Sequence, residues 1–437
     1  MADKQAVTRR RFLECGGAAI VGAAAAPTII TSSALGAKGK PGANGRIGVG
    51  YIGCGRRAGG LRRLPKEGQI VAAADCYLPR AQRAAGQKGK AFQDYRKMLE
   101  LPEVDAVIIA SPDHWHALHA IHACQAGKDV YVEKPMTLTI REGRLMVQAA
   151  RKYERIVQVG TQQRSQKANR IGCELVRNGA AGKLHTVLGH NYPSPWECRL
   201  PGQSVPDGLN WDMWCGPTDV VAFHKDIFTP RANPGWISFR PWSGGEMTGW
   251  GAHGLDQVQW GLGADDTGPV EVWVEGGKYD PPTFTEPGPR RKGETVCNKP
   301  KILYRYADGV VLKLDNGPAG GATFVGERGR ISVDRGRCQS DPKELASAPL
   351  PDGAQRLYVS DNHMGNWFDC IKSRKLPVAD VEIGHRSATV CHLGNIARWL
   401  GRKLKWDPAK ETFPGDKEAN AYLDRPRRKG YRMPETI

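Results

Sequence analysis

The fold is decided by the stretch Ile47-Gly48-Val49-Gly50-Tyr51-Ile52-Gly53-Cys54-Gly55-Arg56-Arg57-Ala58. Its first half predicts a buried strand, and the glycine-rich turn follows where a helix can begin. In a dinucleotide-binding unit, Gly53 permits the tight turn, Gly55 lets the pyrophosphate approach, and Ala58 packs the helix against the strand. The stretch therefore predicts a nucleotide-binding βαβ unit.

A second apolar run, Ile70 to Ala74, ends in an acid, Asp75. A carboxylate at this place binds the adenosine ribose hydroxyls and repels a 2′-phosphate, so NAD is favoured over NADP. Arg80, together with Arg56 and Arg57, is close enough in sequence to weaken that preference.

Strands and helices continue to alternate. Ala106 to Ala110 predicts a strand that runs into the turn Ser111-Pro112-Asp113-His114-Trp115-His116, and a helix is expected from His116 to Gly127. The next strand, Asp129-Val130-Tyr131-Val132-Glu133-Lys134-Pro135, ends at a proline that cannot continue a ladder. These connections predict a right-handed parallel sheet. Ligands bind at the carboxyl ends of such strands, where Lys134 lies.

Composition excludes other classes of site. His116, His119 and His122 lie on neighbouring helical turns, but no carboxylate accompanies them at ligand spacing, so no metal site is expected. The eleven cysteines are dispersed without a C-x-x-C pair, which indicates neither a zinc site nor a disulfide framework. The net charge of +18 comes from scattered bases outside any recognisable nucleic-acid module, so no nucleic-acid partner is expected.

The N-terminus resembles a twin-arginine export signal. Thr8-Arg9-Arg10-Arg11-Phe12-Leu13 precedes an uncharged run from Gly16 to Ile30, although Glu14 stands where a lysine is common. That run is too short and alanine-rich for a comfortable membrane span. We expect a signal over residues 1–37, a linker over 38–44, and a location in the periplasm or cell envelope. An uncleaved anchor or a disordered basic tail is the alternative.

Three motifs, in order, resemble the Gfo/Idh/MocA oxidoreductases, a family that includes glucose-fructose oxidoreductase and inositol dehydrogenase. They are Gly53-x-Gly55-x-x-Ala58, Ser111-Pro112-Asp113-x-x-His116 and Glu133-Lys134-Pro135, with further similarity through Gly160 to Arg164, Trp250 to His253 and Gly401 to Asp407. The resemblance implies an α/β fold with an NAD-binding Rossmann domain of parallel sheet, followed by a substrate and oligomerisation domain whose open sheet is mostly antiparallel. The implied boundaries are 45–159 and 160–424, with helices over 364–400 packing back on the first domain and a basic tail over 425–437.

The second half of the chain agrees with this fold on its own pattern. Short strand-like runs are separated by turn residues. They are His185 to Tyr192, Val270 to Gly276, Ile302 to Tyr306, Val310 to Leu314, Ala322 to Gly326 and Arg330 to Val333. Asp308-Gly309 between two of them predicts a hairpin.

The resemblance assigns residues to a site. The cofactor would contact Gly53, Gly55, Ala58, Asp75, Arg80, Ser111, Pro112, Asp113, His116, Glu133 and Lys134. Lys134, before an expected cis Pro135, would take the proton of a substrate hydroxyl, and partial burial beside the positive nicotinamide would favour the neutral amine that a base must be.

His253 is the second expected catalytic residue, because an imidazole suits proton transfer near neutral pH. Many relatives carry an aspartate one turn earlier, where this chain has Gly249. Arg164, Tyr192, Trp250 and Asp256 are the candidates for substrate contact. Eight of the twelve tryptophans lie between Trp196 and Trp273, and aromatic faces suit sugar rings.

The sequence therefore predicts an oxidoreductase that oxidises a hydroxyl of a sugar, polyol or glycoside with a tightly bound NAD, and that forms a homo-oligomer, a dimer or a tetramer, through the open sheet. The tight binding is inferred from the expected export, because no NADH pool is expected outside the membrane. A redox-neutral NAD-dependent glycosidase is the first alternative, and an inactive sugar-binding or scaffold protein is the second.

Overall fold

The structure, a computed structural model, describes residues 45–229, 235–281, 283–286 and 299–437. Residues 47–437 form one compact unit. The expected signal and linker lie outside the described residues. Among the residues that are described, no helix has the length and apolar character needed to cross a bilayer.

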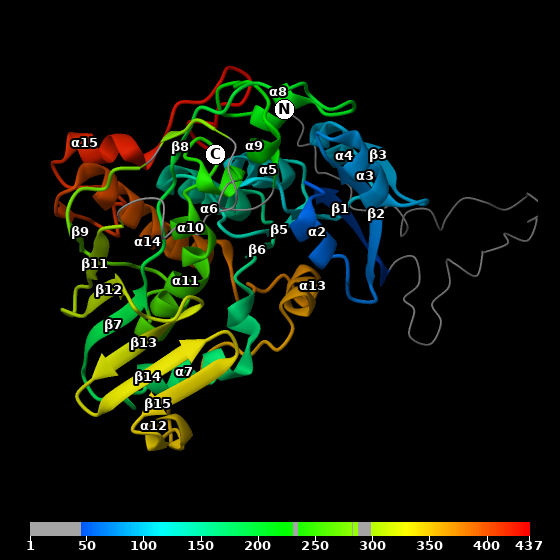
Figure 1. The fold of residues 1–437 in the computed structure, drawn as a ribbon. Helices are drawn as coiled ribbons and strands as arrows, with labels where there is room; N and C mark the ends of the chain where they lie inside the picture. Colours follow the sequence, from blue (N-terminus) through cyan, green and yellow to red (C-terminus); the bar gives the residue numbers. More distant parts are fainter. Residues whose placement is uncertain (1–44, 230–234, 282, 287–298) are drawn as a thin grey trace, which may run out of the picture. The chain divides into compact units, whose positions relative to one another are not determined.

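The first sheet has six parallel strands in the order β3-β2-β1-β4-β5-β6, which confirms the predicted Rossmann fold (Figure 1). Its strands are β1 (Ile47–Ile52), β2 (Gly68–Ala74), β3 (Lys90–Phe92), β4 (Ala106–Ile109), β5 (Asp129–Val132) and β6 (Val157–Val159). The connecting helices are α2 (Arg56–Gly60), α3 (Leu78–Ala85), α4 (Tyr95–Leu99), α5 (Asp113–Gln125) and α6 (Ile140–Lys152).

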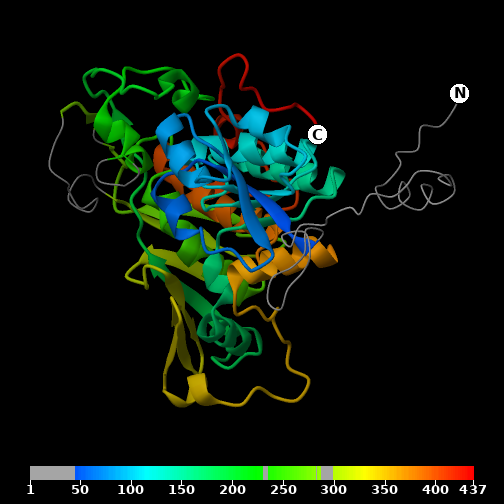
Figure 2. The ribbon, with the colours of Figure 1, turned by 90° about the vertical axis from the view of Figure 1, so that its right-hand side faces the viewer.

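Both faces of this sheet are covered, which explains the continuous apolar runs of its strands. Val107 and Ile109 of β4 belong to one core cluster, whereas Ala106 and Ile108 belong to another on the opposite face. Figure 2 shows the strands of this sheet beside α13 (His363–Ser373), whose Trp367 joins the second of these clusters.

The start of α5 differs from the prediction. The helix begins at Asp113 instead of His116, with Pro112 in extended conformation immediately before it. Proline lacks the N–H that a first turn leaves unpaired, and an acid in that turn is favoured by the helix dipole. Asp113 and His116 therefore belong to the helix rather than to a turn.

The second sheet has eight strands in the order β15-β14-β13-β7-β12-β11-β9-β16. All neighbours are antiparallel except β7 and β12, as a mostly antiparallel sheet requires. Its strands are β7 (Leu184–His190), β9 (Glu271–Glu275), β11 (Lys301–Arg305), β12 (Val311–Asp315), β13 (Gly321–Gly326), β14 (Gly329–Asp334), β15 (Arg337–Asp341) and β16 (Leu404–Lys405). The hairpin at Asp308-Gly309 joins β11 to β12 as predicted, whereas β15 and β16 were not predicted.

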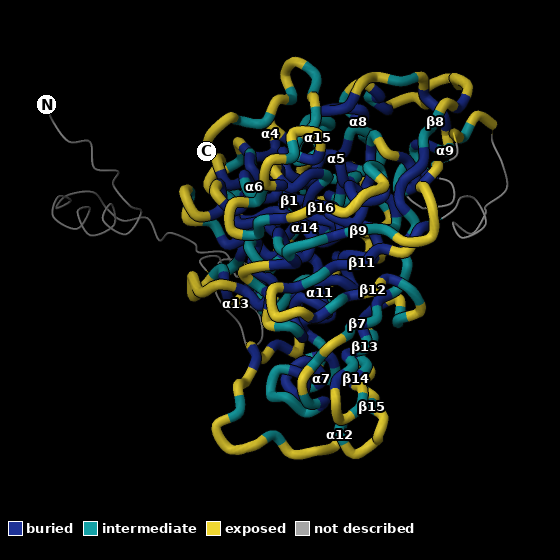
Figure 3. The backbone as a smooth tube through the Cα atoms, turned by 90° about the vertical axis from the view of Figure 1, so that its left-hand side faces the viewer, coloured by how far each residue is buried: buried dark blue, intermediate teal, exposed yellow. Residues whose placement is uncertain are grey.

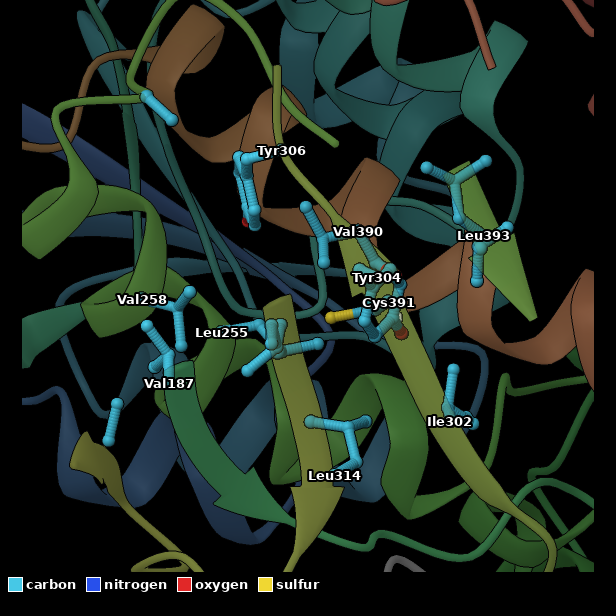
Figure 4. Close-up of a cluster of buried hydrophobic side chains, with 14 of the residues drawn as sticks. Val187, Leu255, Val258, Ile302, Tyr304, Tyr306, Leu314, Val390, Cys391 and Leu393 are labelled. Atoms are coloured by element: carbon cyan, nitrogen blue, oxygen red, sulfur yellow. Dashed lines mark hydrogen bonds between the residues drawn. The ribbon is translucent and has the colours of Figure 1, made fainter. Parts of the chain in front are cut away.

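Three long helices pack on the second sheet: α7 (Lys167–Arg177), α11 (Gly251–Leu262) and α14 (Val381–Leu400). The short α12 (Glu344–Ser347) packs on β14 and β15. Figure 4 shows Leu255 of α11 and Val390 of α14 beside Tyr304 of β11 in the largest core cluster. Helix α14 also packs on α6, one of the helices that connect the strands of the first sheet. It therefore contacts elements of both halves of the fold. It is accordingly buried along most of its length and shows little amphipathic pattern (Figure 3).

The packing of α14 on α6 depends on a glycine. A Cβ on Gly143 of α6 would lie 2.2 Å from Nδ1 of His385 on α14. On its other side, His385 Nε2 lies 2.6 Å from Glu411 Oε1, and Glu411 also accepts a hydrogen bond from Arg144. The imidazole is therefore held between a carboxylate and the glycine backbone.

An aromatic lobe, made of residues 193–229 and 235–242, is inserted between β7 and α10 (Glu246–Gly249). It contains β8 (Glu197–Cys198), α8 (Trp211–Cys215) and α9 (Lys225–Phe228), and Trp211 and Trp214 stack with ring centroids 4.5 Å apart. The lobe is attached to the residues after β2, because Asn210 N donates to Cys76 O at 2.9 Å and Leu78 N donates to Gly208 O at 3.1 Å.

The basic tail ties the lobe to the first sheet's helices. Arg427 forms an almost fully buried ion pair with Glu142 of α6 at 2.9 Å. Arg428 pairs with Asp212 of α8 at 2.6 Å, and Tyr431 packs edge-on against Trp115 of α5. The lobe is thus anchored from two sides.

Replacing Gly143 with alanine should destabilise the protein by about 1–3 kcal/mol, because the added methyl displaces His385 and separates α6 from α14. The matched control is Gly59→Ala in α2, where no atom lies within 4 Å of the new methyl. Urea denaturation measures both variants. Equal free energies of unfolding for the two variants would contradict the proposed close approach.

Candidate active site

The glycine turn after β1 is held in the conformation that the fingerprint needs. Gly53 has a φ of +80°, and a Cβ there would lie 2.4 Å from the backbone nitrogen of Ser111. At Gly55, by contrast, no protein atom lies within 4 Å of an added Cβ. The turn therefore packs against β4 on one side and leaves open space on the other, where a pyrophosphate can approach.

The side chain of Asp75 is hydrogen-bonded to the glycine turn. Its Oδ2 accepts a hydrogen bond from Cys54 N at 2.7 Å, and its Oδ1 accepts one from Tyr77 N at 2.8 Å. Burial raises the pKa of this carboxyl, while the two amides favour its ionised form. The acid thus fixes the glycine turn as well as lying at the expected ribose position.

A cleft with a cavity volume of about 210 Å³, open to solvent, follows the carboxyl edge of the first sheet. Its walls include ten of the eleven residues predicted to bind the cofactor, which are Gly53, Gly55, Asp75, Arg80, Ser111, Pro112, Asp113, His116, Glu133 and Lys134. Ala58 is buried in the core instead, as its packing role requires. The structure thus brings together, along one groove, residues that lie far apart in the sequence.

Two loops of the cleft are joined by His116. Its ring nitrogens lie 2.7 Å from the carbonyl oxygens of Ser111 and Pro135. Burial lowers the pKa of the imidazole, which is inaccessible to solvent. The Lys134-Pro135 bond is cis, as predicted. His116 therefore positions the segment that carries Lys134.

Lys134 projects toward the helices of the second sheet. Its Nζ donates to the carbonyl oxygen of Gly249 at 2.8 Å, and both residues line the cleft. His253 lies nearby but behind the cleft wall, 7% exposed. Its pKa is lowered by burial and by the positive charges of Lys134 and Arg335. The lysine is therefore presented to a ligand, whereas the histidine is covered in this structure.

Asp113 is a buried acid in the same region. Ser243 Oγ donates to its Oδ2 at 2.7 Å, and burial raises the pKa of the carboxyl to about 7. The positive charge of Lys134 opposes this shift. Asp113 therefore links the cleft to Ser243, which directly follows the aromatic lobe.

The four expected substrate residues, Arg164, Tyr192, Trp250 and Asp256, are not among the residues that line the cleft. Arg164 is 1% exposed and bound by Asp256 at 2.8 Å and by Asp265 at 2.7 Å. Because Asp256 is fully buried in this pair, neither residue can contact a ligand here, and the expectation for both needs correction. The physical reason is that a buried guanidinium must be paired.

Tyr192 and Trp250 have different surroundings. The Tyr192 hydroxyl is bound to Ala319 O at 2.7 Å and its ring is buried. Trp250 is 41% exposed, with the guanidinium of Arg335 stacked 4.2 Å from its ring centroid. Of the four expected substrate residues, Trp250 is the one whose side chain is open to solvent.

Several cleft residues were missed from the sequence. The aromatic lobe contributes Met213, Trp214, Phe228, Trp236 and Ile237 to the cleft wall. The concentration of tryptophans signalled an aromatic segment, but its contact with the nucleotide side of the cleft could not be found from spacing. Arg57 was considered only for phosphate, yet it forms an ion pair with Glu133 at 2.7 Å.

Metal and thiol chemistry find no support among the described residues. Within them, no group of three or more His, Cys, Asp or Glu side chains could hold a metal ion. The nine described cysteines are free, and burial raises the pKa of several thiols, to about 12 at Cys124 and about 11 at Cys198 and Cys215.

Curated relatives match part of the chain. Levoglucosan dehydrogenase of Pseudarthrobacter phenanthrenivorans is 28% identical over 190 residues, 41% of this chain and 46% of the relative. Inositol 2-dehydrogenase of Salmonella typhimurium is 30% identical over 172 residues, 38% and 49% respectively. A glycosyl hydrolase family 109 protein of Shewanella baltica is 26% identical over 221 residues, 44% and 48%. The chain spans about half the length of these relatives.

The fold is also that of a solved structure, the WlbA dehydrogenase from Bordetella pertussis in complex with NADH and UDP-GlcNAcA. The TM-score is 0.57 at 18% identity, with 83% of this chain and 99% of that chain covered. Two family models match: "Oxidoreductase family, NAD-binding Rossmann fold" over residues 45–161 and "Oxidoreductase family, C-terminal alpha/beta domain" over residues 174–433. With the glycine turn, the cleft and both sheets in place, this chain belongs to the Gfo/Idh/MocA oxidoreductase family.

Proposed function

We propose that the protein is an NAD-dependent oxidoreductase that acts on a hydroxyl of a sugar, polyol or glycoside. The observation that carries this proposal is the position of Lys134, at the carboxyl end of β5 and on the wall of the cleft that begins at the glycine turn. The residues present fit a dinucleotide, because the space beside Gly55 is open and the acid and arginine expected at the ribose line the same cleft.

The chemistry divides between the cofactor and the chain. When bound, the nicotinamide supplies a hydride acceptor for a carbinol carbon. Lys134 takes the hydroxyl proton, and its hydrogen bond to Gly249 O directs the amine. Trp236 and Ile237 of the aromatic lobe add an apolar wall to the cleft, against which a sugar ring can pack.

The structure also supports tight retention of the cofactor. Arg80, which lines the cleft, stacks on Phe228 of the lobe at 4.3 Å, so the lobe packs directly on the expected adenosine end. The lobe is in turn anchored by Asn210 to Cys76 and by the tail to α8 and α6. Release of a dinucleotide would require the lobe to move, which slows dissociation.

A redox-neutral glycosidase is a second candidate function. The match to a glycosyl hydrolase family 109 protein favours it, and a retained cofactor suits a cycle in which the hydroxyl is oxidised and later reduced. Such an enzyme would release the aglycone without any net gain of reduced nicotinamide. An inactive sugar-binding or scaffold protein is the remaining alternative.

Location and assembly are part of the same proposal. The arginine motif at Arg9 and Arg10 supports export by a twin-arginine route, which suits a protein folded around its cofactor. Homo-oligomer formation is supported by β12 and β14 of the second sheet, where buried residues alternate with more exposed ones, so one face of these strands is more open than the other.

Replacing Lys134 with alanine should lower the turnover of a sugar, polyol or glycoside substrate by about 10²- to 10⁴-fold, the usual contribution of a general base. The control is Lys128→Ala, a lysine immediately before β5 whose Nζ donates to Leu101 O and which does not line the cleft. A panel that includes levoglucosan and inositol is assayed both for reduced nicotinamide and for bond cleavage.

Accumulating reduced nicotinamide without cleavage supports the dehydrogenase, whereas cleavage without accumulation supports the glycosidase. If the wild type turned over none of the panel while Lys134→Ala bound ligand normally, the inactive alternative would replace both.

Loosening the lobe should release the cofactor. Arg428→Ala removes the ion pair with Asp212, and the dinucleotide should dissociate about three- to tenfold faster, as the loss of about 1 kcal/mol predicts. The control is Arg432→Ala, a tail residue exposed to solvent. Mass spectrometry and absorbance of the purified protein identify and count the dinucleotide. A wild-type protein that purifies empty would contradict retention.

The export proposal is tested on the full chain. The double substitution Arg9→Lys with Arg10→Lys should keep the protein inside the cytoplasm, while Arg11→Lys should leave export unchanged. Cell fractionation and immunoblotting measure the two pools. Equal export of both variants would overturn the twin-arginine assignment.

A further inference from the structure

A carboxylate that the sequence did not single out lies beside Lys134. Glu246 is the first residue of α10, one helical turn before Gly249. Its Oε2 would lie only 3.0 Å from a Cβ placed on Gly249, and it accepts a hydrogen bond from Trp250 N at 3.2 Å. The carboxylate therefore occupies the space that a side chain at position 249 would need.

The amine of Lys134 is hydrogen-bonded to the backbone carbonyl of the same glycine, Gly249. Nζ lies 2.8 Å from Gly249 O, so the amine and the Glu246 carboxylate both border a single residue on the cleft wall. No direct ion pair joins the amine to the Glu246 carboxylate, so a proton that passes between them needs one water or a ligand hydroxyl as a bridge. Proton transfer through one water is within the normal reach of acid–base catalysis.

The charges around Glu246 come from several elements. Burial raises the pKa of its carboxyl and the positive charge of Lys134 opposes that shift. The negative charge of Glu246 contributes to the raised pKa of Asp113 at the start of α5 and of Tyr192 after β7. The positive charge of Lys134 also lowers the pKa of His253 on α11. Glu246 thus interacts electrostatically with Lys134, Asp113 and Tyr192.

We propose that Glu246 is the proton acceptor for Lys134, receiving through one water the proton that the amine takes from the substrate hydroxyl. This inference rests on the proposed function. The O–H bond of the substrate breaks as an N–H bond forms on Nζ; the ammonium then gives a proton to the water, and the water gives one to the carboxylate. Glu246 returns the proton to solvent, so the amine is neutral for the next cycle.

Gly249 has a defined part in this arrangement. Without a side chain there, the glutamate one turn earlier can extend into the site. The longer side chain of Glu246 supplies the carboxylate that an aspartate at position 249 would otherwise supply. The Gly249 carbonyl accepts the hydrogen bond from Lys134 Nζ. A protein that carries an acid at position 249 and a residue without a carboxyl at position 246 should therefore keep the proton acceptor.

The first experiment needs no turnover. Glutamate labelled with ¹³C at Cδ is followed by NMR against pH, and the Glu246 signal is assigned by its loss in Glu246→Gln. Its pKa should lie above the ordinary value and should rise further in Lys134→Met, because a stabilising positive charge is removed. Lys372→Met, a change to a surface lysine, should leave it unchanged. An ordinary pKa that ignores Lys134 would overturn the proposal.

The second experiment relocates the carboxylate. Glu246→Gln should lower kcat about 100-fold and remove the acidic limb of the pH profile, because the ionised acid that accepts the proton is lost as pH falls through its pKa. The double variant Glu246→Ala with Gly249→Asp should recover kcat to within about tenfold of wild type and restore that limb, whereas Glu246→Ala alone should not.

These outcomes separate the two proposals. If no substrate is turned over by the wild type, the function fails, while the NMR titration still decides whether Glu246 and Lys134 are coupled. If turnover is normal in Glu246→Gln with an unchanged pH profile, the role of Glu246 is wrong and the proposed function stands. Circular dichroism of each variant confirms that it is folded.

Discussion

The hydrogen bond from Lys134 Nζ to the Gly249 carbonyl joins the two halves of the active cleft. Its donor stands at the end of a strand of the parallel sheet, and its acceptor belongs to a short helix that leads into α11 on the second sheet. This hydrogen bond couples the position of the amine to the position of α10. A second connection between the two halves is the close packing of α14 on α6, with Gly143 against His385.

The sequence predicted the parallel sheet well because its signals are local. A glycine turn with a positive φ, an acid at the end of β2 and a proline after Lys134 each have a direct steric or hydrogen-bonding cause. The same holds for most strands of the second sheet, whose alternation and turn residues are visible in the chain. The start of α5 was misplaced because Asp113 was interpreted as part of a turn, whereas an acid suits a first helical turn equally well.

The rest of the site depended on contacts between distant residues, which spacing cannot reveal. Arg164 and Asp256 have the composition of a substrate site, but the fold turns them toward each other and buries both. The aromatic lobe is visible as a concentration of tryptophans, yet nothing in the sequence indicates that Phe228 covers Arg80. A glutamate one turn before Gly249 belongs to no motif, so the position of Glu246 near Lys134 could not be predicted from the sequence.

The described cysteines are all free thiols, so the described part of the fold contains no disulfide bond. Each described cysteine is unlinked, and where burial holds the thiol in its protonated form, little thiolate is available to react with an oxidant. Among the described residues, no covalent cross-link joins distant parts of the chain. The connection between the tail and α6 therefore depends on non-covalent contacts such as the buried ion pair of Arg427 with Glu142.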